Sequence, residues 1–167
     1  MEDAVAEVLR QWRRIHPDLD TLPIAVIGRL TRCTVLLQQA AGAPLTREGL
    51  ARPEFDLLGA LQRVGRDLTP TQLARETFSS GAAVTKRLRR LEERGLVERR
   101  ADERDRRVAR VSLTEEGRRL IARLVPEQVG YEASLLSALG TDRQRELADV
   151  LSELLVLLEG RLGGVRF

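Results

Sequence analysis

The sequence predicts a mostly α-helical fold that carries one short β-hairpin, an α+β arrangement. Aromatic residues make up only 3% of the 167 residues and charged residues make up 32%. This balance is typical of amphipathic helices with solvated outer faces. Most apolar residues recur at three- and four-residue spacing, which indicates helices. Two short segments after residue 95 alternate with a two-residue period instead, and that spacing predicts strands.

The first 65 residues contain three predicted helices, which follow from apolar residues at helical spacing and from the breakers that end them. Pro17 ends the first helix, and the segment AGAP at 41–44 ends the second, which extends from about 24 to 41. A polar stretch follows the second helix. Pro53 lies in the first turn of the third helix, and Gly65 stops it.

Two capped helices joined by a short turn are predicted next. Thr69 is the expected N-cap of a short helix that begins at Pro70, and Ser79 or Ser80 is the expected N-cap of a longer helix. Gly95 stops the longer helix. Two helices joined by such a turn form a helix-turn-helix motif.

The segments LVERR at 96–100 and RVARVSL at 107–113 are the two strand candidates, and their hairpin would form a wing. Thr114 and Thr141 are the expected N-caps of two further helical runs, with a kink or break at Pro126. The last run carries five leucines on one side: Leu147, Leu151, Leu154, Leu155 and Leu158. The predicted domains are residues 1–52 (N-terminal helices for dimerisation and an effector pocket), 53–114 (winged helix-turn-helix) and 115–167 (C-terminal dimerisation helices).

Positive charge is concentrated in one segment. Residues 86–110 hold eleven Lys or Arg against six Asp or Glu, so this segment carries +5 while the whole chain carries +3. Such a segment suits a polyanion, because each phosphate that it neutralises releases condensed counterions. The other interpretation of these charges is a solvated helix surface.

The helical wheel of the longer helix separates a buried stripe from an outer face. Leu88 and Leu91 fall within about 40° of Val84 and define the stripe. The opposite face carries Ala82, Lys86, Arg89 and, at its edge, Arg90. Arg and Lys can donate to guanine edges and phosphates, so this face is a candidate for the DNA groove. A structural interpretation also stands, in which Arg89 pairs with Glu93 on a surface helix.

Four segments and the leucine-rich terminal helix resemble the MarR family of bacterial regulators, over nearly the whole chain. These segments are EFDLLGAL, LTPTQLA, SSGAAVTKRLRRLEERGLVERR and DERDRRVARVSLTEEG. The resemblance implies a winged helix-turn-helix homodimer that binds pseudo-palindromic duplex DNA, more often as a repressor. It also implies that Arg107 enters the minor groove and that Asp105 orients it. The expected DNA contacts are Thr69, Ser79, Ser80, Gly81, Ala82, Lys86, Arg89, Arg90, Arg104, Asp105 and Arg107.

Members of this family commonly respond to small aromatic or anionic effectors, and one subgroup responds to urate. This sequence matches the effector-site pattern of that subgroup with Trp12, Asp56, Arg87 and Arg99. Arg87 lies about 60° from the buried stripe, so it faces inward or sideways and needs Asp56 or an anionic ligand as its partner. Each residue also has a structural interpretation: an apolar stripe for Trp12, a helix dipole for Asp56 and a phosphate contact for Arg99.

The sequence holds no Gly-rich phosphate loop and no Ser or Cys nucleophile signature, so neither an enzyme nor a cofactor is expected. Cys33 is expected to be a buried structural thiol rather than a redox sensor. With His16 it supplies too few ligands for a metal site. No apolar run approaches a membrane span and no secretory signal is present, which favours a cytoplasmic protein. The competing function is a nonspecific architectural DNA-binding protein without an effector.

Overall fold

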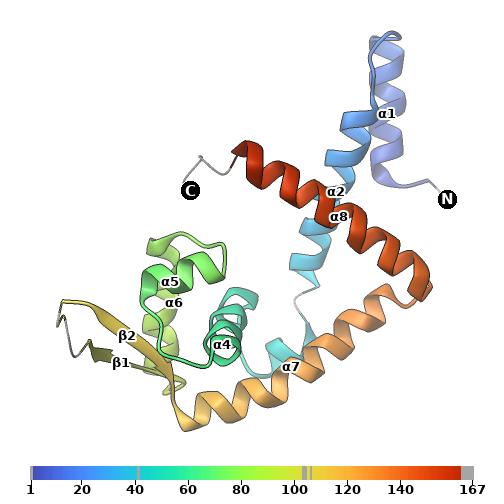
Figure 1. The fold of residues 1–167 in the computed structure, drawn as a ribbon. Helices are drawn as coiled ribbons and strands as arrows, with labels where there is room; N and C mark the ends of the chain where they lie inside the picture. The colour runs from blue at the N-terminus through green and yellow to red at the C-terminus, as the bar shows by residue number, and fades with distance from the viewer. Residues whose placement is uncertain (1, 41, 103–104, 106, 163–167) are drawn as a thin grey trace. The chain divides into compact units, whose positions relative to one another are not determined.

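A computed structural model describes residues 2–40, 42–102, 105 and 107–162 (Figure 1). The chain divides into two compact units, Met1–Ala41 and Gly42–Phe167. None of the described helices is both long enough and apolar enough to cross a membrane.

The first unit is a pair of helices, α1 (Ala4–Ile15) and α2 (Leu22–Gln39). The carboxylate of Asp3 caps α1, because its Oδ1 accepts hydrogen bonds from two N–H groups of the first turn at 2.9 Å. Its Oδ2 accepts a hydrogen bond from Arg29 Nε at 2.9 Å, which ties the start of α1 to α2. The predicted end of α1 before Pro17 is confirmed.

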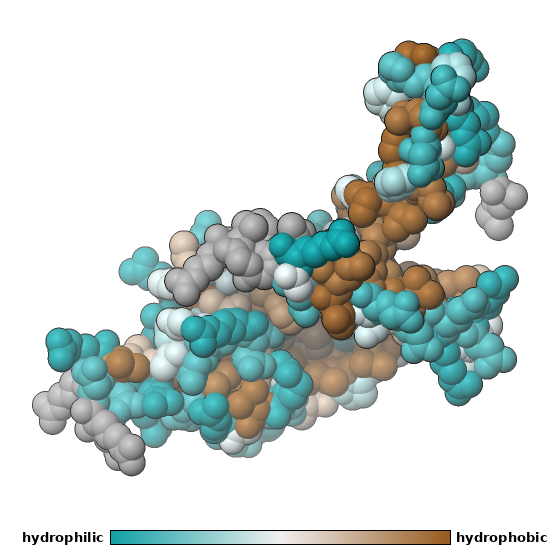
Figure 2. Space-filling view, turned by 45° about the horizontal axis from the view of Figure 1, so that its top comes forward, coloured by the Kyte–Doolittle hydropathy of each residue, from teal (hydrophilic) through white to brown (hydrophobic). Residues whose placement is uncertain are grey.

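Cys33 is exposed on α2, so the prediction of a buried thiol is wrong. The physical reason is that no residue of α2 is buried within this chain. Figure 2 shows apolar side chains open at the surface along this pair of helices. The large exposed apolar residues of α2 are Leu22, Val26, Ile27, Val35, Leu36 and Leu37.

The second unit contains six helices and one two-stranded sheet among its described residues. In order they are α3 (Ala43–Arg47), α4 (Arg52–Val64), α5 (Pro70–Glu76), α6 (Gly81–Glu93), β1 (Val97–Ala101), β2 (Ala109–Leu113), α7 (Glu115–Leu136) and α8 (Thr141–Leu162). The elements from α4 to β2 confirm the predicted order. Helix α3 was not predicted, since its five residues fall within the segment interpreted as breaker-rich and polar. Gly65 and Gly95 both have a φ of 68°, a left-handed conformation that ends α4 and α6.

The antiparallel sheet pairs Val97 with Leu113 and Ala101 with Ala109. The segment before α5 adds one bridge to this sheet. Leu68 N–H donates to the Val111 carbonyl at 3.0 Å, and Val111 N–H donates to the Leu68 carbonyl at 2.8 Å. These bonds attach the base of the hairpin to the helical core.

The core of the second unit lies between α4, α5, α6, α7 and the sheet. Val84, Leu88 and Leu91 have no exposed surface, which confirms the predicted buried stripe of α6. They belong to one cluster that includes fully buried side chains from the other elements: Leu58, Leu73, Val111, Ile121 and Leu124. Burial of this stripe fixes which side of α6 faces solvent.

Helix α7 runs unbroken through Pro126, so the predicted break at that residue is absent. Proline removes one backbone donor, which leaves the carbonyl of Ala122 without its helical partner. Both residues are exposed, so water can solvate that carbonyl. Thr141 is the first residue of α8 rather than its N-cap, because Gln144 N–H donates to the Gly140 carbonyl at 3.1 Å.

Candidate nucleic-acid interface

The N-terminus of α6 is open to solvent and lies next to its capping residue. Ser80 Oγ accepts a hydrogen bond from Ala83 N–H at 3.3 Å, which identifies Ser80 rather than Ser79 as the N-cap. Gly81 and Ala82 are exposed. Because first-turn amides carry partial positive charge, this end of α6 is suited to a phosphate.

We expect Ser80→Ala to lower the free energy of unfolding by about 1 kcal/mol, because Ala83 N–H would lose its acceptor. Ser79→Ala is the matched control, since the Ser79 hydroxyl donates to the Thr77 carbonyl at 3.2 Å and caps no helix. Urea unfolding followed by circular dichroism measures both values. Equal losses in the two variants would contradict the capping assignment.

The outer face of α6 presents cations that the rest of the described chain does not neutralise. Lys86 and Arg89 are exposed, and neither forms a hydrogen bond or ion pair with another described residue. The interpretation in which Arg89 pairs with Glu93 is therefore wrong. Two unpaired cations opposite a buried stripe are available to phosphates or base edges.

Arg90 differs from these two residues because it has a partner in the core. Its Nε lies 3.4 Å from Oε1 of Glu54, whose side chain is only 3% exposed. The other oxygen of Glu54 accepts a hydrogen bond from Ala51 N–H at 2.9 Å. A buried carboxylate needs such partners, so Arg90 helps to hold α6 against α4.

The tip of the hairpin presents Arg107 outward from an acidic turn. Asp105 Oδ1 accepts a hydrogen bond from Arg107 N–H at 3.0 Å and lies 3.4 Å from Arg107 Nε. The Arg107 side chain is 94% exposed. Asp102 supports the turn, because it accepts from Asp105 N–H at 3.2 Å and pairs with Arg110 at 2.6 Å. The predicted contact Arg104 lies outside the described residues.

Thr69 occupies the N-cap of α5, as predicted. Its hydroxyl accepts a hydrogen bond from Gln72 N–H at 3.2 Å, and Gln72 Oε1 accepts one from Thr69 N–H at 2.9 Å. This capping box fixes the start of α5, the helix before the turn that leads to α6. The described candidate contacts therefore come from the starts of two helices, the outer face of α6 and the hairpin tip.

The residues predicted for an effector site do not contact one another in the second unit. Asp56 pairs with Arg52 at 2.9 Å, so the expectation that it serves Arg87 is wrong. Within the described residues Arg87 forms no hydrogen bond or ion pair. Arg99 Nε is buried 3.2 Å from Glu92 without hydrogen-bond geometry. In the other unit Trp12 stacks on His16, with ring centroids 5.7 Å apart.

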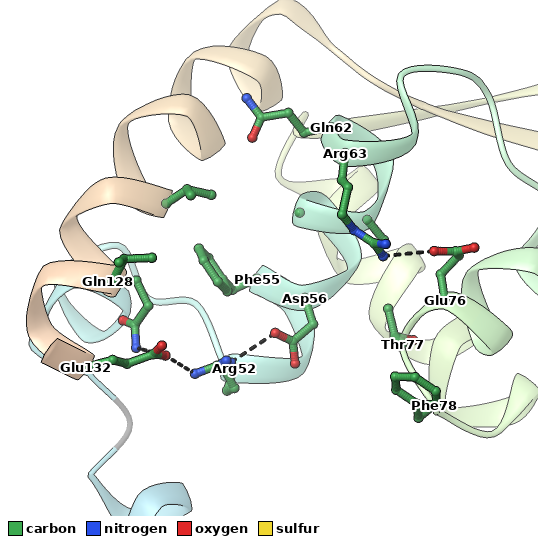
Figure 3. A pocket seen from close by; sticks show the side chains of 14 residues that line it. Arg52, Phe55, Asp56, Gln62, Arg63, Glu76, Thr77, Phe78, Gln128 and Glu132 are labelled. Carbon is green, nitrogen blue, oxygen red and sulfur yellow. Dashed lines mark hydrogen bonds and ion pairs between the residues drawn. The ribbon is translucent and has the colours of Figure 1, made fainter. Parts of the chain in front are cut away.

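Sequence reasoning missed a pocket of about 630 Å³ between α4, α7 and the turn from α5 to α6 (Figure 3). At one end Arg52 pairs with Asp56 at 2.9 Å and with Glu132 at 2.5 Å. At the other end Arg63 pairs with Glu76 at 2.8 Å. The i,i+4 spacing of Arg52 and Asp56 was the one local signal for this site.

The chain resembles known transcriptional regulators along most of its length. Residues 48–108 match a family model described as MarR family. The regulator PecS of Dickeya dadantii is 36% identical over 149 residues, which cover 88% of this chain and 90% of PecS. A second relative, the transcriptional repressor MprA of Escherichia coli, is 30% identical over 116 residues, which cover 69% of this chain and 66% of MprA.

Solved structures share the fold. The organohalide-sensing regulator RdhR-CbdbA1625 in its 2,4-dichlorophenol-bound form has a TM-score of 0.74 at 20% identity, over 83% of this chain and 81% of that chain. The MepR–DNA complex from S. aureus has a TM-score of 0.66 at 23% identity, over 77% and 93%. The predicted fold class, mostly helical with a winged helix-turn-helix, is confirmed.

Proposed function

Because the chain belongs to the MarR family of transcriptional regulators, we propose that it binds pseudo-palindromic duplex DNA as a homodimer. Helix α6 enters the major groove and Arg107 enters the minor groove of each half-site. One observation carries this proposal: Lys86 and Arg89 lie unpaired, among the described residues, on the face of α6 opposite its buried stripe. Such a protein acts on the nucleoid in the cytoplasm, and repression is the sign of regulation that we propose.

The proposed homodimer is supported by apolar surface that the single chain leaves uncovered. Leucines of α8 lie exposed in a stripe: Leu147, Leu151 and Leu155 are 44%, 38% and 54% exposed. Together with the exposed face of α2, they would be buried in a two-fold assembly of residues 1–52 and 115–167. A two-fold dimer places two α6 helices about one turn of DNA apart, roughly 10 base pairs.

Leu151→Asp should raise the dissociation constant of the dimer by about 10- to 100-fold, because the variant buries a charge in the proposed interface. Ser152→Asp makes the same charge change about 100° further around α8 and should leave assembly unchanged. Sedimentation equilibrium measures both constants. A dimer that tolerates Leu151→Asp would exclude α8 from the interface.

Footprinting on the promoter that adjoins the gene tests the central proposal. A protected pseudo-palindrome with two half-sites one turn apart is expected for a specific regulator. A nonspecific architectural protein, the competing function, would protect DNA without preference for one site. Uniform protection would therefore overturn specific regulation while leaving DNA binding intact.

We propose further that a small anionic or aromatic effector such as urate releases the DNA. Two guanidiniums support this step: Arg87 is unpaired among the described residues, and Arg99 Nε is buried without a hydrogen bond. An anion would satisfy both, and one that draws on Arg87 would act on α6 directly. Urate titration should change the fluorescence of Trp12, the only tryptophan, and lower DNA affinity. Invariance of both signals would sink the urate proposal.

A further inference from the structure

The pocket between α4, α7 and the turn from α5 to α6 has more negative than positive charge in its wall. Its charged lining residues are three carboxylates, Asp56, Glu76 and Glu132, and two guanidiniums, Arg52 and Arg63. Arg63 is used by Glu76, while Arg52 serves both other carboxylates. One negative charge is therefore left without a cation among the described lining residues.

The wall between the two ion-paired ends is largely apolar and includes two aromatic rings. Figure 3 shows Phe55 beside Arg52 and Asp56, and Phe78 below the pair of Arg63 and Glu76. Arg52 Cζ already lies 5.7 Å from the centroid of the Phe55 ring. Aromatic faces attract cations, so the rings and the excess carboxylate favour the same sign of ligand charge.

Arg52 is poorly available to an anionic ligand. Burial by itself would lower the pKa of Arg52, but the hydrogen bonds and charges of Asp56 and Glu132 outweigh burial and raise the pKa. An entering anion would have to displace one of these carboxylates and would then be repelled by the other. A cation meets the opposite situation, because it can pair with a carboxylate while Arg52 stays bound.

We propose that this pocket is a binding site for an organic cation with an apolar, aromatic body. The cationic centre lies toward Asp56 and Glu132, and the apolar body packs between Phe55 and Phe78. This site is separate from Arg87 and Arg99, which do not line the pocket. The inference goes beyond the proposed DNA regulation, and binding to the free protein does not depend on it.

The pocket also has a physical connection to α6. Phe78 has a φ of 51°, unusual for a bulky residue, and 91% of its surface is exposed. It lies two residues before Ser80, the N-cap of α6. A ligand that packs on the Phe78 ring therefore acts on the turn that positions the start of α6.

Two ions of nearly the same size and shape but opposite charge test the proposal: tetraphenylphosphonium and tetraphenylborate. Calorimetric titration of the full chain without DNA should show at least tenfold tighter binding of the phosphonium. Glu132→Gln should weaken phosphonium binding about tenfold, as should Phe78→Ala. Glu146→Gln makes the same charge change on α8, outside the pocket, and should leave binding unchanged.

Equal binding of the two ions would overturn the proposal, and so would unchanged phosphonium binding in Glu132→Gln. Asp56→Asn provides a second variant if Glu132→Gln loses its circular dichroism signal. Fluorescence anisotropy with operator DNA separates this proposal from the function above. Loss of phosphonium binding with intact DNA binding would count against the pocket alone. Phosphonium binding by a chain that binds no DNA would count against the regulator alone.

Discussion

Raising the salt concentration from 50 to 200 mM should weaken operator binding by about 10³- to 10⁵-fold, the loss expected for roughly six to ten phosphate contacts. The exposed cations of α6 and the hairpin supply these contacts, twice over in a dimer. Each contact releases condensed counterions, and added salt reduces the entropy gained by that release. Fluorescence anisotropy of labelled operator DNA across the salt range measures the slope. A flat response would contradict binding through Lys86, Arg89 and Arg107.

Arg107→Ala connects this salt dependence to one residue. The variant should bind operator DNA about tenfold more weakly and with a shallower salt slope, because a nearly fully exposed guanidinium is removed from each hairpin. Arg143→Ala removes the same charge from α8, where Arg143 pairs with Glu146 at 3.3 Å, and should leave DNA affinity unchanged. Equal losses in the two variants would show that only net charge matters.

Gly117→Val should reduce the free energy of unfolding by about 3 kcal/mol or more. A Cβ atom on Gly117 would lie 2.0 Å from the backbone carbonyl oxygen of Leu96, a contact that no rotamer change relieves. The first turn of α7 would have to move away from the start of β1. Stabilities of whole domains are only about 5–15 kcal/mol, so this loss is a large fraction. Urea unfolding at fixed protein concentration measures it.

Gly130→Ala is the control for this prediction, because it adds a methyl group to the same helix at a position with no neighbouring atom within 4 Å. Alanine favours the helix over glycine, so the variant should gain about 0.5–1 kcal/mol. A loss of similar size in both variants would assign the effect to glycine removal in general rather than to the contact with Leu96.

The sequence predicted best those features that depend on neighbouring residues. Caps at Thr69 and Thr114 and stops at Gly65 and Gly95 depend on local backbone chemistry, and all four hold in the structure. The outer face of α6 was predictable for a similar reason, because a buried stripe at helical spacing fixes the opposite side of the same helix.

Features that depend on distant residues or on solvent escaped prediction. The break at Pro126 is absent because water can reach the carbonyl that proline leaves unpaired. Cys33 was placed in a core, but α2 has an apolar face that this chain alone does not cover. Asp56 was assigned to Arg87, whereas Arg52 lies one helical turn away and is joined by Glu132 from α7. No spacing rule along one helix indicates such a third partner.

The junction at Thr114 joins the DNA-facing helix to the long helix that follows the hairpin. The Thr114 hydroxyl donates to the Gly95 carbonyl at 2.6 Å and accepts from Gly117 N–H at 3.0 Å. The end of α6 and the start of α7 are thus pinned to one oxygen atom, and the two helices turn together like the arms of a bent lever. In a dimer, a small tilt of α7 would swing each α6 and change the span between the paired reading heads.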